Sequence, residues 1–302
     1  MNRVLRPGVA LALVAITVGC RAETRQTARS IDSSEIARRE TRLDQSLAAN
    51  GGAVPSDSAL ARWILPTSLN EISGLALTTD GRLFTHGDER AVISQVDYRK
   101  GEVIKQFQLG KRVVKGDFEG ITIVGDIMFM LTSTGKLYEF REGGNGDRVD
   151  YSIHDTELGH ECEFEGIAYD KSINSLLLSC KNVGTKRMQD SLVIYRWNLS
   201  ETGRNRISHI SGNPAAIVQE NDWKGLHPSD ITVDPISGNY VLVSSQESAL
   251  IWVKPDGTVL SARPLPGGHD QAEGLAITQD SILIVSDEAG KRPAVITLYR
   301  WH

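Results

Sequence analysis

Three glutamates, Glu119, Glu165 and Glu273, stand at the same place in three copies of one short motif, each directly before a glycine. Two further copies have Ser73 and Ser229 at that place. Carboxylates that are brought close together repel one another, and they respond by a raised pKa or by binding a cation. Several carboxylate oxygens around one point suit calcium, which takes about six to eight oxygen ligands. The spacing therefore indicates the chemistry of hard-cation binding.

Whether these glutamates meet depends on the elements that carry them, and those elements form a repeat. The copies read ISGLAL, FEGITI, FEGIAY, PSDITV and AEGLAI, and their aligned positions are Gly74, Gly120, Gly166, Asp230 and Gly274. The intervals between these positions are 46, 46, 64 and 44 residues. A period near 45 residues is the length of a four-stranded propeller blade. The sequence therefore predicts an all-β fold, a five-bladed β-propeller with four-stranded blades.

The ring can close in one way that uses every predicted strand. The last copy is followed by only two further strands, and one apolar strand stands alone ahead of the first copy. We expect this strand, within residues 60–66, to join the last blade as its outer strand, so that no sheet edge stays open. The long third interval is too short for a sixth blade, so its extra residues are expected in loops within residues 182–224.

In a propeller the first strand of each blade lines the central channel, and the second strand returns to the end where the first began. We call this end of the channel the mouth. The ends of the second strands add a second polar set there, namely Asp88, Glu89, Ser133, Lys181, Gln246, Glu247, Asp287 and Glu288. The sequence therefore predicts one calcium near the mouth. Its principal ligands would be Glu119, Glu165 and Glu273, followed by Glu71 and Asp230; the alternative is a solvated acidic rim.

Four histidines fall in segments expected at the mouth: His86, His160, His227 and His269. A histidine there could act as a general base beside a metal-bound water. The sequence has no His-x-x-x-His pattern and no Gly-x-Ser-x-Gly elbow. The interpretation therefore favours binding over catalysis and assigns no catalytic residue.

The N-terminus has the pattern of an export signal. Arg3 and Arg6 precede an apolar run of about ten residues, which is too short to span a bilayer. Gly19 and Cys20 follow, and this ending is similar to a bacterial lipobox, in which Cys20 would be lipidated. An ordinary cleaved signal or an uncleaved anchor is the alternative. We expect residues 1–20 to be a lipoprotein signal peptide.

Residues 21–57 are rich in Arg, Glu, Ser, Thr and Ala and have few large apolar side chains. We expect a flexible, solvated tether there, in which a short helix could form, followed by the propeller domain at residues 58–302. The expected location is the cell envelope, with the lipid on Cys20 holding the chain to a membrane. A formal net charge of -5 gives no argument for nucleic acid as a partner.

Two cysteines lie in the third copy of the repeat, Cys162 before its first strand and Cys180 at the end of its second. An oxidising envelope would favour a disulfide between them. Their offset along the hairpin disfavours it, and two free buried thiols are the alternative. The sequence leaves this pairing open.

Taken in order, these motifs resemble the SdiA-regulated family of bacterial envelope proteins over roughly residues 60–302. The resemblance rests on the Glu-Gly-Ile copies, the closing Ala-Glu-Gly-Leu-Ala and the strand ends Ser244-Ser-Gln-Glu and Ser286-Asp-Glu. It implies a five-bladed propeller with a calcium site and no established activity. More distant similarity extends to NHL-repeat and strictosidine-synthase-like propellers, and esterase-like phytase propellers look similar around Glu-Gly-Ile.

Two classes of function follow from these expectations. The first is a calcium-containing envelope module that binds a small molecule or a protein on the face around the mouth. The alternative is a calcium-dependent hydrolase of phosphoesters, esters or lactones. The fold hosts both classes, so it does not choose between them.

Overall fold

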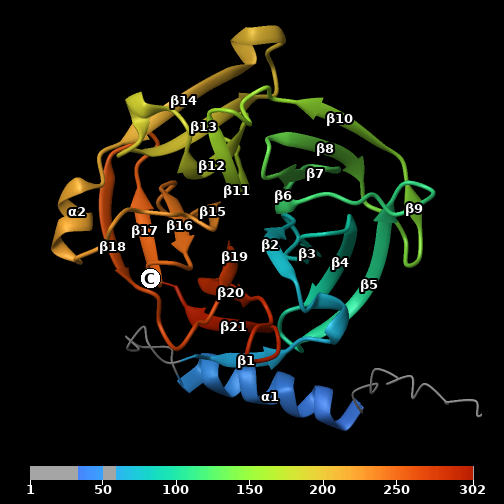
Figure 1. The fold of residues 1–302 in the computed structure, drawn as a ribbon. Helices are drawn as coiled ribbons and strands as arrows, with labels where there is room; N and C mark the ends of the chain where they lie inside the picture. Colours follow the sequence, from blue (N-terminus) through green and yellow to red (C-terminus); the bar gives the residue numbers. More distant parts are fainter. Residues whose placement is uncertain (1–32, 50–58, 302) are drawn as a thin grey trace, which may run out of the picture. The chain divides into compact units, whose positions relative to one another are not determined.

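The computed structural model describes residues 33–49 and 59–301. The predicted signal peptide at residues 1–20 and the lipidation site Cys20 lie outside these residues. Within them the strands form five sheets that surround a common centre (Figure 1). The predicted all-β, five-bladed propeller is confirmed.

The first three blades follow one another along the chain. Blade 1 consists of β2 (Ile72–Leu77), β3 (Leu83–Gly87), β4 (Val92–Asp97) and β5 (Glu102–Leu109), to which β9 (Arg148–Val149) adds in parallel. Blade 2 consists of β6 (Phe118–Val124), β7 (Ile127–Thr132), β8 (Lys136–Arg141) and β10 (Tyr151–Asp155). Blade 3 consists of β11 (Cys162–Asp170), β12 (Ser175–Val183), β13 (Leu192–Asn198) and β14 (Ile207–Gly212).

The last two blades complete the ring. Blade 4 consists of β15 (Asp230–Val233), β16 (Tyr240–Ser244), β17 (Ala249–Val253) and β18 (Val259–Pro264). Blade 5 consists of β19 (Ala272–Ile277), β20 (Ile282–Asp287), β21 (Val295–Arg300) and β1 (Ala61–Ile64). Short 3₁₀ turns lie at η1 (Thr67–Leu69), η2 (Lys186–Met188) and η3 (Gly203–Arg206).

The extra length of the third interval lies in two loops. One loop joins β12 to β13 and contains η2, and the other joins β14 to β15 and contains α2 (Ala215–Glu220). Neither loop adds a strand to the ring, which is why a longer interval leaves the number of blades at five.

The first strands of the five blades are neighbours around the channel, in the order β2, β6, β11, β15, β19 and back to β2. Glycine at the aligned position permits this approach. A Cβ added to Gly74 would lie 2.8 Å from the Cα of Gly120, and one added to Gly120 would lie 3.1 Å from the Cα of Gly166. Real Cβ atoms essentially never lie within 3.0 Å of a backbone atom, and at 3.1 Å the neighbouring strand would have to shift, so the repeated glycine sets the spacing of the inner strands.

The apolar core lies between the blades. One cluster joins Phe84 of blade 1 to Phe118 and Phe140 of blade 2, and the next joins Leu131 of blade 2 to Phe164 of blade 3. Each sheet thus buries both faces against its neighbours. The mouth of the channel is lined by polar residues at the starts of the inner strands.

The strand β1 pairs antiparallel with β21 in the register Ala61 to Leu298. Its Trp63 is buried, and the indole Nε1 donates to the carbonyl oxygen of Tyr98 at 2.8 Å, which ties blade 5 to blade 1. That the ring depends on the strand stays a prediction.

A helix, α1 (Ser33–Ala49), lies within the segment expected to be a solvated tether. Leu43 on this helix is fully buried in the same apolar cluster as Trp63. Two ion pairs flank it, from Arg99 to Asp44 at 2.7 Å and from Lys100 to Glu40 at 2.9 Å. The helix that the sequence allowed in this segment is therefore present, and one apolar side chain and two charged side chains of it contact the propeller. That residues 21–57 act as a tether stays a prediction.

Candidate functional site

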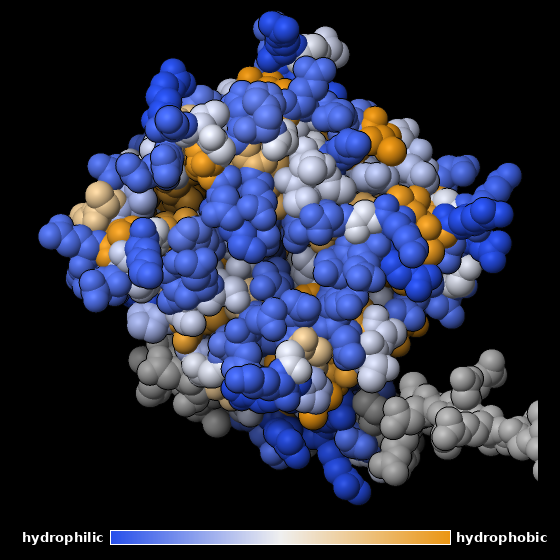
Figure 2. Space-filling view, viewed as in Figure 1, coloured by the Kyte–Doolittle hydropathy of each residue, from blue (hydrophilic) through white to orange (hydrophobic). Residues whose placement is uncertain are grey.

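The mouth of the channel contains a pocket of about 230 Å³, which we call the acidic pocket. It is lined by Glu71, Ile72, Ser73, Asp88, Glu119, Glu165, Lys181, Gln271, Glu273 and Glu288. Residues from the starts of the first strands and from the ends of the second strands thus meet there, as the repeat predicted. Figure 2 shows hydrophilic residues gathered over the centre of the ring on the face that it displays.

Glu165 is the glutamate that has a cationic partner. Its Oε1 accepts a hydrogen bond from Lys181 Nζ at 2.7 Å, and its side chain is 9% exposed. Burial raises the pKa of Glu165, and the hydrogen bond and charge of Lys181 oppose that rise. Lys181 lies near the end of β12, in the second polar set that the sequence predicted at the mouth.

Glu119 and Glu273 share the pocket without such a pairing. Burial, followed by the charge of Glu165, raises the pKa of Glu119 to about 9 and that of Glu273 to about 7. Lys181 lowers both values without cancelling the rise. At neutral pH the pocket therefore holds protons that an incoming cation can replace.

Glu71 belongs to the rim of the same pocket. The negative charge of Asp88, then burial and the charge of Glu89, raise its pKa. Glu288, which lines the same pocket, has its pKa raised by burial and by the charges of Asp88 and Glu71. The carboxylates of blades 1 and 5 thus add to the negative potential over the three motif glutamates.

Asp230 is the one predicted ligand that is not among the residues lining the acidic pocket. It is 1% exposed and does not line the acidic pocket. Its Oδ1 accepts the N–H of Ile231, and its Oδ2 accepts the N–H of Leu275, both at 2.8 Å. Burial raises its pKa well above the ordinary value, while these backbone hydrogen bonds lower it. The carboxylate therefore joins β15 to β19 below the pocket.

The four histidines considered as bases lie outside the residues that line the acidic pocket. His227 Nδ1 lies 2.8 Å from Glu247 Oε1, and His269 Nδ1 lies 2.6 Å from Asp287 Oδ2. His86 is fully buried, and burial lowers its pKa to about 4. His160 is exposed. These positions give no base beside the glutamates, so the polar groups of the pocket itself carry its chemistry.

Cys162 and Cys180 are joined by a disulfide in the structure, with Cα atoms 5.6 Å apart. The bond links β11 to β12 in blade 3, and Cys180 directly precedes Lys181. It fixes the end of the strand that carries the one lysine of the acidic pocket. Mass spectrometry before and after reduction tests the bond directly, because reduction of a disulfide adds two hydrogen atoms to the mass of the chain.

The side chains of the acidic pocket offer the oxygen donors that calcium prefers. Among residues 33–49 and 59–301, no three Asp, Glu, His or Cys side chains are already arranged as a metal centre. The ammonium of Lys181 holds the Oε1 of Glu165 instead. A cation that enters must therefore displace Lys181 from Glu165 and the protons from Glu119 and Glu273. The oxygen donors of the acidic pocket therefore fit a hard cation that displaces Lys181 and these protons.

Comparison with solved structures identifies the fold. The chain is similar to the glutaminyl cyclase of Myxococcus xanthus, with a TM-score of 0.54, 11% sequence identity, and coverage of 80% of this chain and 94% of that one. It is also similar to a luciferin-regenerating enzyme, with a TM-score of 0.51, 8% identity, and coverage of 80% and 97%. At such identities the likeness concerns the fold alone. No curated protein matches the sequence.

The amino-acid sequence also matches a protein-family model over part of its length. The model described as SdiA-regulated matches residues 209–300, which span the end of blade 3, blade 4 and most of blade 5. This stretch contains the copies PSDITV and AEGLAI on which the resemblance was based. The five-bladed ring and this match together confirm the predicted resemblance of the chain to the SdiA-regulated family of propellers.

Proposed function

We propose that this propeller is an envelope-anchored, calcium-binding module whose acidic pocket holds the metal and whose face around the mouth receives a ligand or partner. The observation that carries the metal site is the convergence of Glu119, Glu165 and Glu273 on one pocket, in which Lys181 is the one basic residue in the lining. Once Glu119 and Glu273 release their protons, the three carboxylates outnumber the one ammonium and leave an excess of negative charge at the mouth. A bound divalent cation would neutralise it.

In this proposal the three motif glutamates hold calcium and Glu71 supports them from the rim. Calcium bound at that place would draw the inner strands of blades 1, 2, 3 and 5 together through side chains. Lys181 acts as an internal competitor that occupies Glu165 when the metal is absent. The module therefore binds calcium with an affinity set partly by a residue of its own.

Thermal melting of the full chain with and without calcium tests this proposal. Calcium is expected to raise the midpoint, and Glu119→Gln is expected to abolish the rise, because it removes a ligand while keeping the side-chain shape. Lys181→Met is expected to enlarge the rise by removing the competitor. Asp126→Asn removes one exposed carboxylate outside the pocket and is the matched control. A rise of equal size in Glu119→Gln and in the control would contradict the site.

The anchoring part of the proposal rests on the sequence of residues 1–20. The structure has no helix, within its described residues, that is long and apolar enough to cross a membrane. Phase partition in detergent tests the anchor in the native bacterial host. The wild-type chain should enter the detergent phase, and Cys20→Ser should stay in the aqueous phase; equal partition of the two would refute lipidation at Cys20.

A calcium-dependent hydrolase is the second candidate, and one observation favours it. The pKa of Glu273 is raised to about 7, near the value that suits a general base at neutral pH. A panel of phosphoester, ester and lactone substrates, assayed with and without calcium, separates the candidates. Turnover that needs calcium and is lost in Glu273→Gln would favour the hydrolase, and an inactive wild-type protein would favour the module.

A further inference from the structure

A second pocket, which we call the basic pocket, lies at the other end of the strands, between blade 1 and blade 2. Its volume is about 450 Å³, within the range of sites for small molecules. On β2 the acidic pocket takes Ile72 and Ser73, whereas the basic pocket takes Thr78, just beyond the opposite end. On β6 the corresponding residues are Glu119 and Ile123. The two pockets are therefore separate sites.

The two pockets differ in charge: carboxylates predominate in the lining of the acidic pocket, and cationic side chains predominate in the lining of the basic pocket. The lining of the basic pocket has three positive charges, on Arg82, Lys105 and Arg141, against two negative ones, on Glu142 and Asp126, while Asp80 pairs with Arg82 from outside the lining. The whole chain has a formal net charge of -5. A local excess of cations on an acidic protein favours an anionic ligand.

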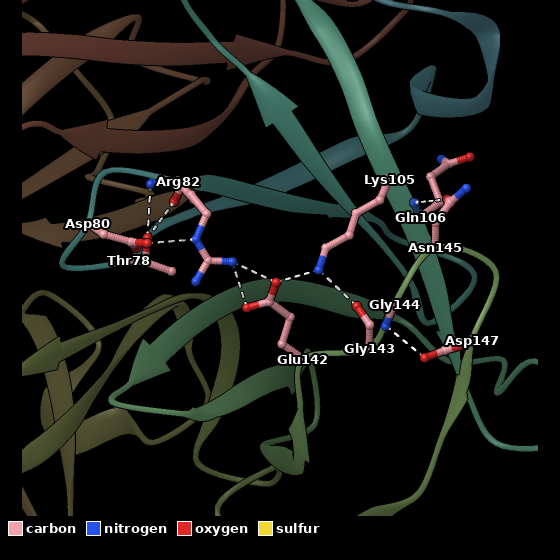
Figure 3. A network of polar contacts seen from close by, with 10 residues as sticks. All are labelled: Thr78, Asp80, Arg82, Lys105, Gln106, Glu142, Gly143, Gly144, Asn145 and Asp147. Atoms are coloured by element: carbon pink, nitrogen blue, oxygen red, sulfur yellow. Dashed lines mark hydrogen bonds and ion pairs between the residues drawn. The ribbon is translucent and has the colours of Figure 1, made fainter.

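Three segments that are distant in sequence build the network at this pocket, as Figure 3 shows. Arg82 follows the turn after β2, Lys105 lies on β5, and Glu142 follows β8. Arg82 Nη1 donates to both carboxylate oxygens of Glu142, at 2.6 and 2.7 Å. Lys105 Nζ donates to the same carboxylate and, at 2.8 Å, to the carbonyl oxygen of Gly143. The protein thus already contains a carboxylate receptor, occupied by its own Glu142.

The cationic groups are held in place by more than this one carboxylate. Arg82 Nε donates to Asp80 Oδ2 at 2.9 Å. The charged ends of Arg82 and Lys105 lie 5.5 and 5.8 Å from the ring centroid of Phe84, which is fully buried. Both cations therefore rest over one aromatic face, which favours them there. A receptor whose donors are positioned in advance loses little entropy on binding.

Donor groups in the pocket are left for a ligand. Arg141 is 71% exposed at its side chain, and its nearest carboxylate, Asp126, is 3.8 Å away, which is too far for a hydrogen bond. Arg82 uses its Nε and Nη1 in the contacts above and directs one guanidinium nitrogen, Nη2, to neither Asp80 nor Glu142. Guanidinium groups suit the paired oxygens of carboxylate and phosphate. Ile123 and Met128 supply an apolar wall for the rest of a small molecule.

We propose that the basic pocket binds a small molecule bearing an oxyanion, a carboxylate or a phosphate, through Arg141 and Arg82, with Lys105 adding to the positive potential. Glu142 is a positioning residue, which holds Arg82 and Lys105 in place and competes with the ligand for them. Hydrogen bonds from Arg82 and Lys105 outweigh the effect of burial and lower the pKa of Glu142, so it stays ionised in that competition.

Calorimetric titration of the full chain with inorganic phosphate, and separately with citrate, tests this inference at constant ionic strength. At least one probe should bind saturably, and the probe that binds shows which oxyanion the site takes. Arg141→Gln should weaken that binding about tenfold, the usual effect of losing a charge-assisted contact. Arg112→Gln, which removes an exposed arginine outside the pocket, should leave it unchanged.

Glu142→Gln separates a binding site from a network that only stabilises the fold. As a competitor, Glu142 weakens oxyanion binding, so the variant should bind the probe at least about threefold more tightly. Circular dichroism melting establishes that each variant is folded at the titration temperature. Absence of saturable binding by both probes, or equal affinity in wild type, Arg141→Gln and Glu142→Gln, would overturn the inference.

Discussion

The three motif glutamates differ in their surroundings although they share one place in the repeat. Glu165 is paired with Lys181, whereas Glu119 and Glu273 owe their raised pKa values to burial and to the negative charge of Glu165. The difference arises because Lys181 ends the second strand of blade 3, and the other blades have no lysine there. One repeat position thus supplies three carboxyl groups of unequal charge state.

The calcium-free protein should lose stability as the pH rises. The folded state holds a proton on Glu119 up to a pKa of about 9, whereas the same carboxyl in the unfolded chain releases it near 4.5. Between these values the folded state binds more protons, so the free energy of unfolding falls with increasing pH. Glu273 acts in the same direction up to about 7.

Melting midpoints from pH 5 to pH 9 in the presence of a calcium chelator measure this effect. The midpoint should fall across the range, and the fall should be smaller in Glu119→Gln, which has no proton to lose there. Asp126→Asn again serves as the charge-matched control. An identical slope in wild type and Glu119→Gln would contradict the assigned protonation of Glu119.

Asp230 should act on stability and leave calcium binding unchanged. Asp230→Ala removes the acceptor of the Leu275 N–H in the interior, and an unsatisfied buried donor costs about 1–3 kcal/mol. Chemical unfolding should therefore show a loss of about that size. A calcium titration of the same variant should give the wild-type affinity; a strongly weakened affinity without loss of stability would restore Asp230 as a ligand.

The sequence could place the glutamates because the repeat fixes their register, and register fixes which side of the strand faces the channel. It did not show that the carboxylate of Asp230 accepts hydrogen bonds from backbone amides. A carboxylate in a motif looks the same whether its oxygens face a metal or the amides of a neighbouring blade, and Leu275 lies 45 residues away. The network of Arg82, Lys105 and Glu142 was missed for the same reason, since its partners are 60 and 37 residues apart.

At the scale of the element, the aligned glycines decide how closely the inner strands pack. Gly74→Ala places a Cβ 2.8 Å from the Cα of Gly120 and 2.9 Å from the N of Ile121, both backbone atoms that cannot rotate away. Overpacking of this kind costs about 1–3 kcal/mol. We expect a loss of stability in that range by chemical unfolding.

Gly268→Ala is the control for this prediction, because a Cβ there meets no atom within 4 Å. Its effect on unfolding should be within about 0.5 kcal/mol of zero, as for most surface substitutions. Equal losses in Gly74→Ala and Gly268→Ala would show that the close approach of β2 and β6 is not what the glycine serves.

The helix α1 shows where the sequence pattern was insufficient at this scale. Its apolar residues are few, so the segment reads as a spacer, and the packing depends on Leu43 meeting the cluster around Trp63. Arg39 lies 5.3 Å from the Trp63 ring centroid and adds a cation–π contact. Leu43 and Arg39 make these contacts only because β1 and β21 form a surface for them, and the spacing of apolar residues in the sequence does not show that surface.

At the scale of the whole molecule, the ring should depend on β1. A chain that begins at residue 67 lacks this strand and leaves β21 with an open edge, which invites pairing with other chains. We expect it to melt at a lower temperature and to aggregate, as measured by light scattering during the melt. A chain that begins at residue 33 keeps α1 and β1 and is the control; equal behaviour of the two chains would refute the closing role.

The overall architecture could be predicted because five copies at a near-constant interval leave few arrangements, and the count of strands selects one. The same symmetry explains why the site could be predicted only in part. It brings five equivalent positions together, but blade 3 alone contributes a lysine and a disulfide, and blade 4 contributes a carboxylate that serves the fold. Departures from the repeat determine the chemistry.

Calcium titration by calorimetry at pH 6 and at pH 8 tests the central claim, a calcium site made by the motif glutamates, most directly. We expect one calcium for each chain, bound more tightly at pH 8 because fewer protons must leave Glu119 and Glu273, and bound at least about tenfold more weakly in Glu119→Gln. The absence of saturable binding at both pH values, or equal affinity in wild type and Glu119→Gln, would contradict it.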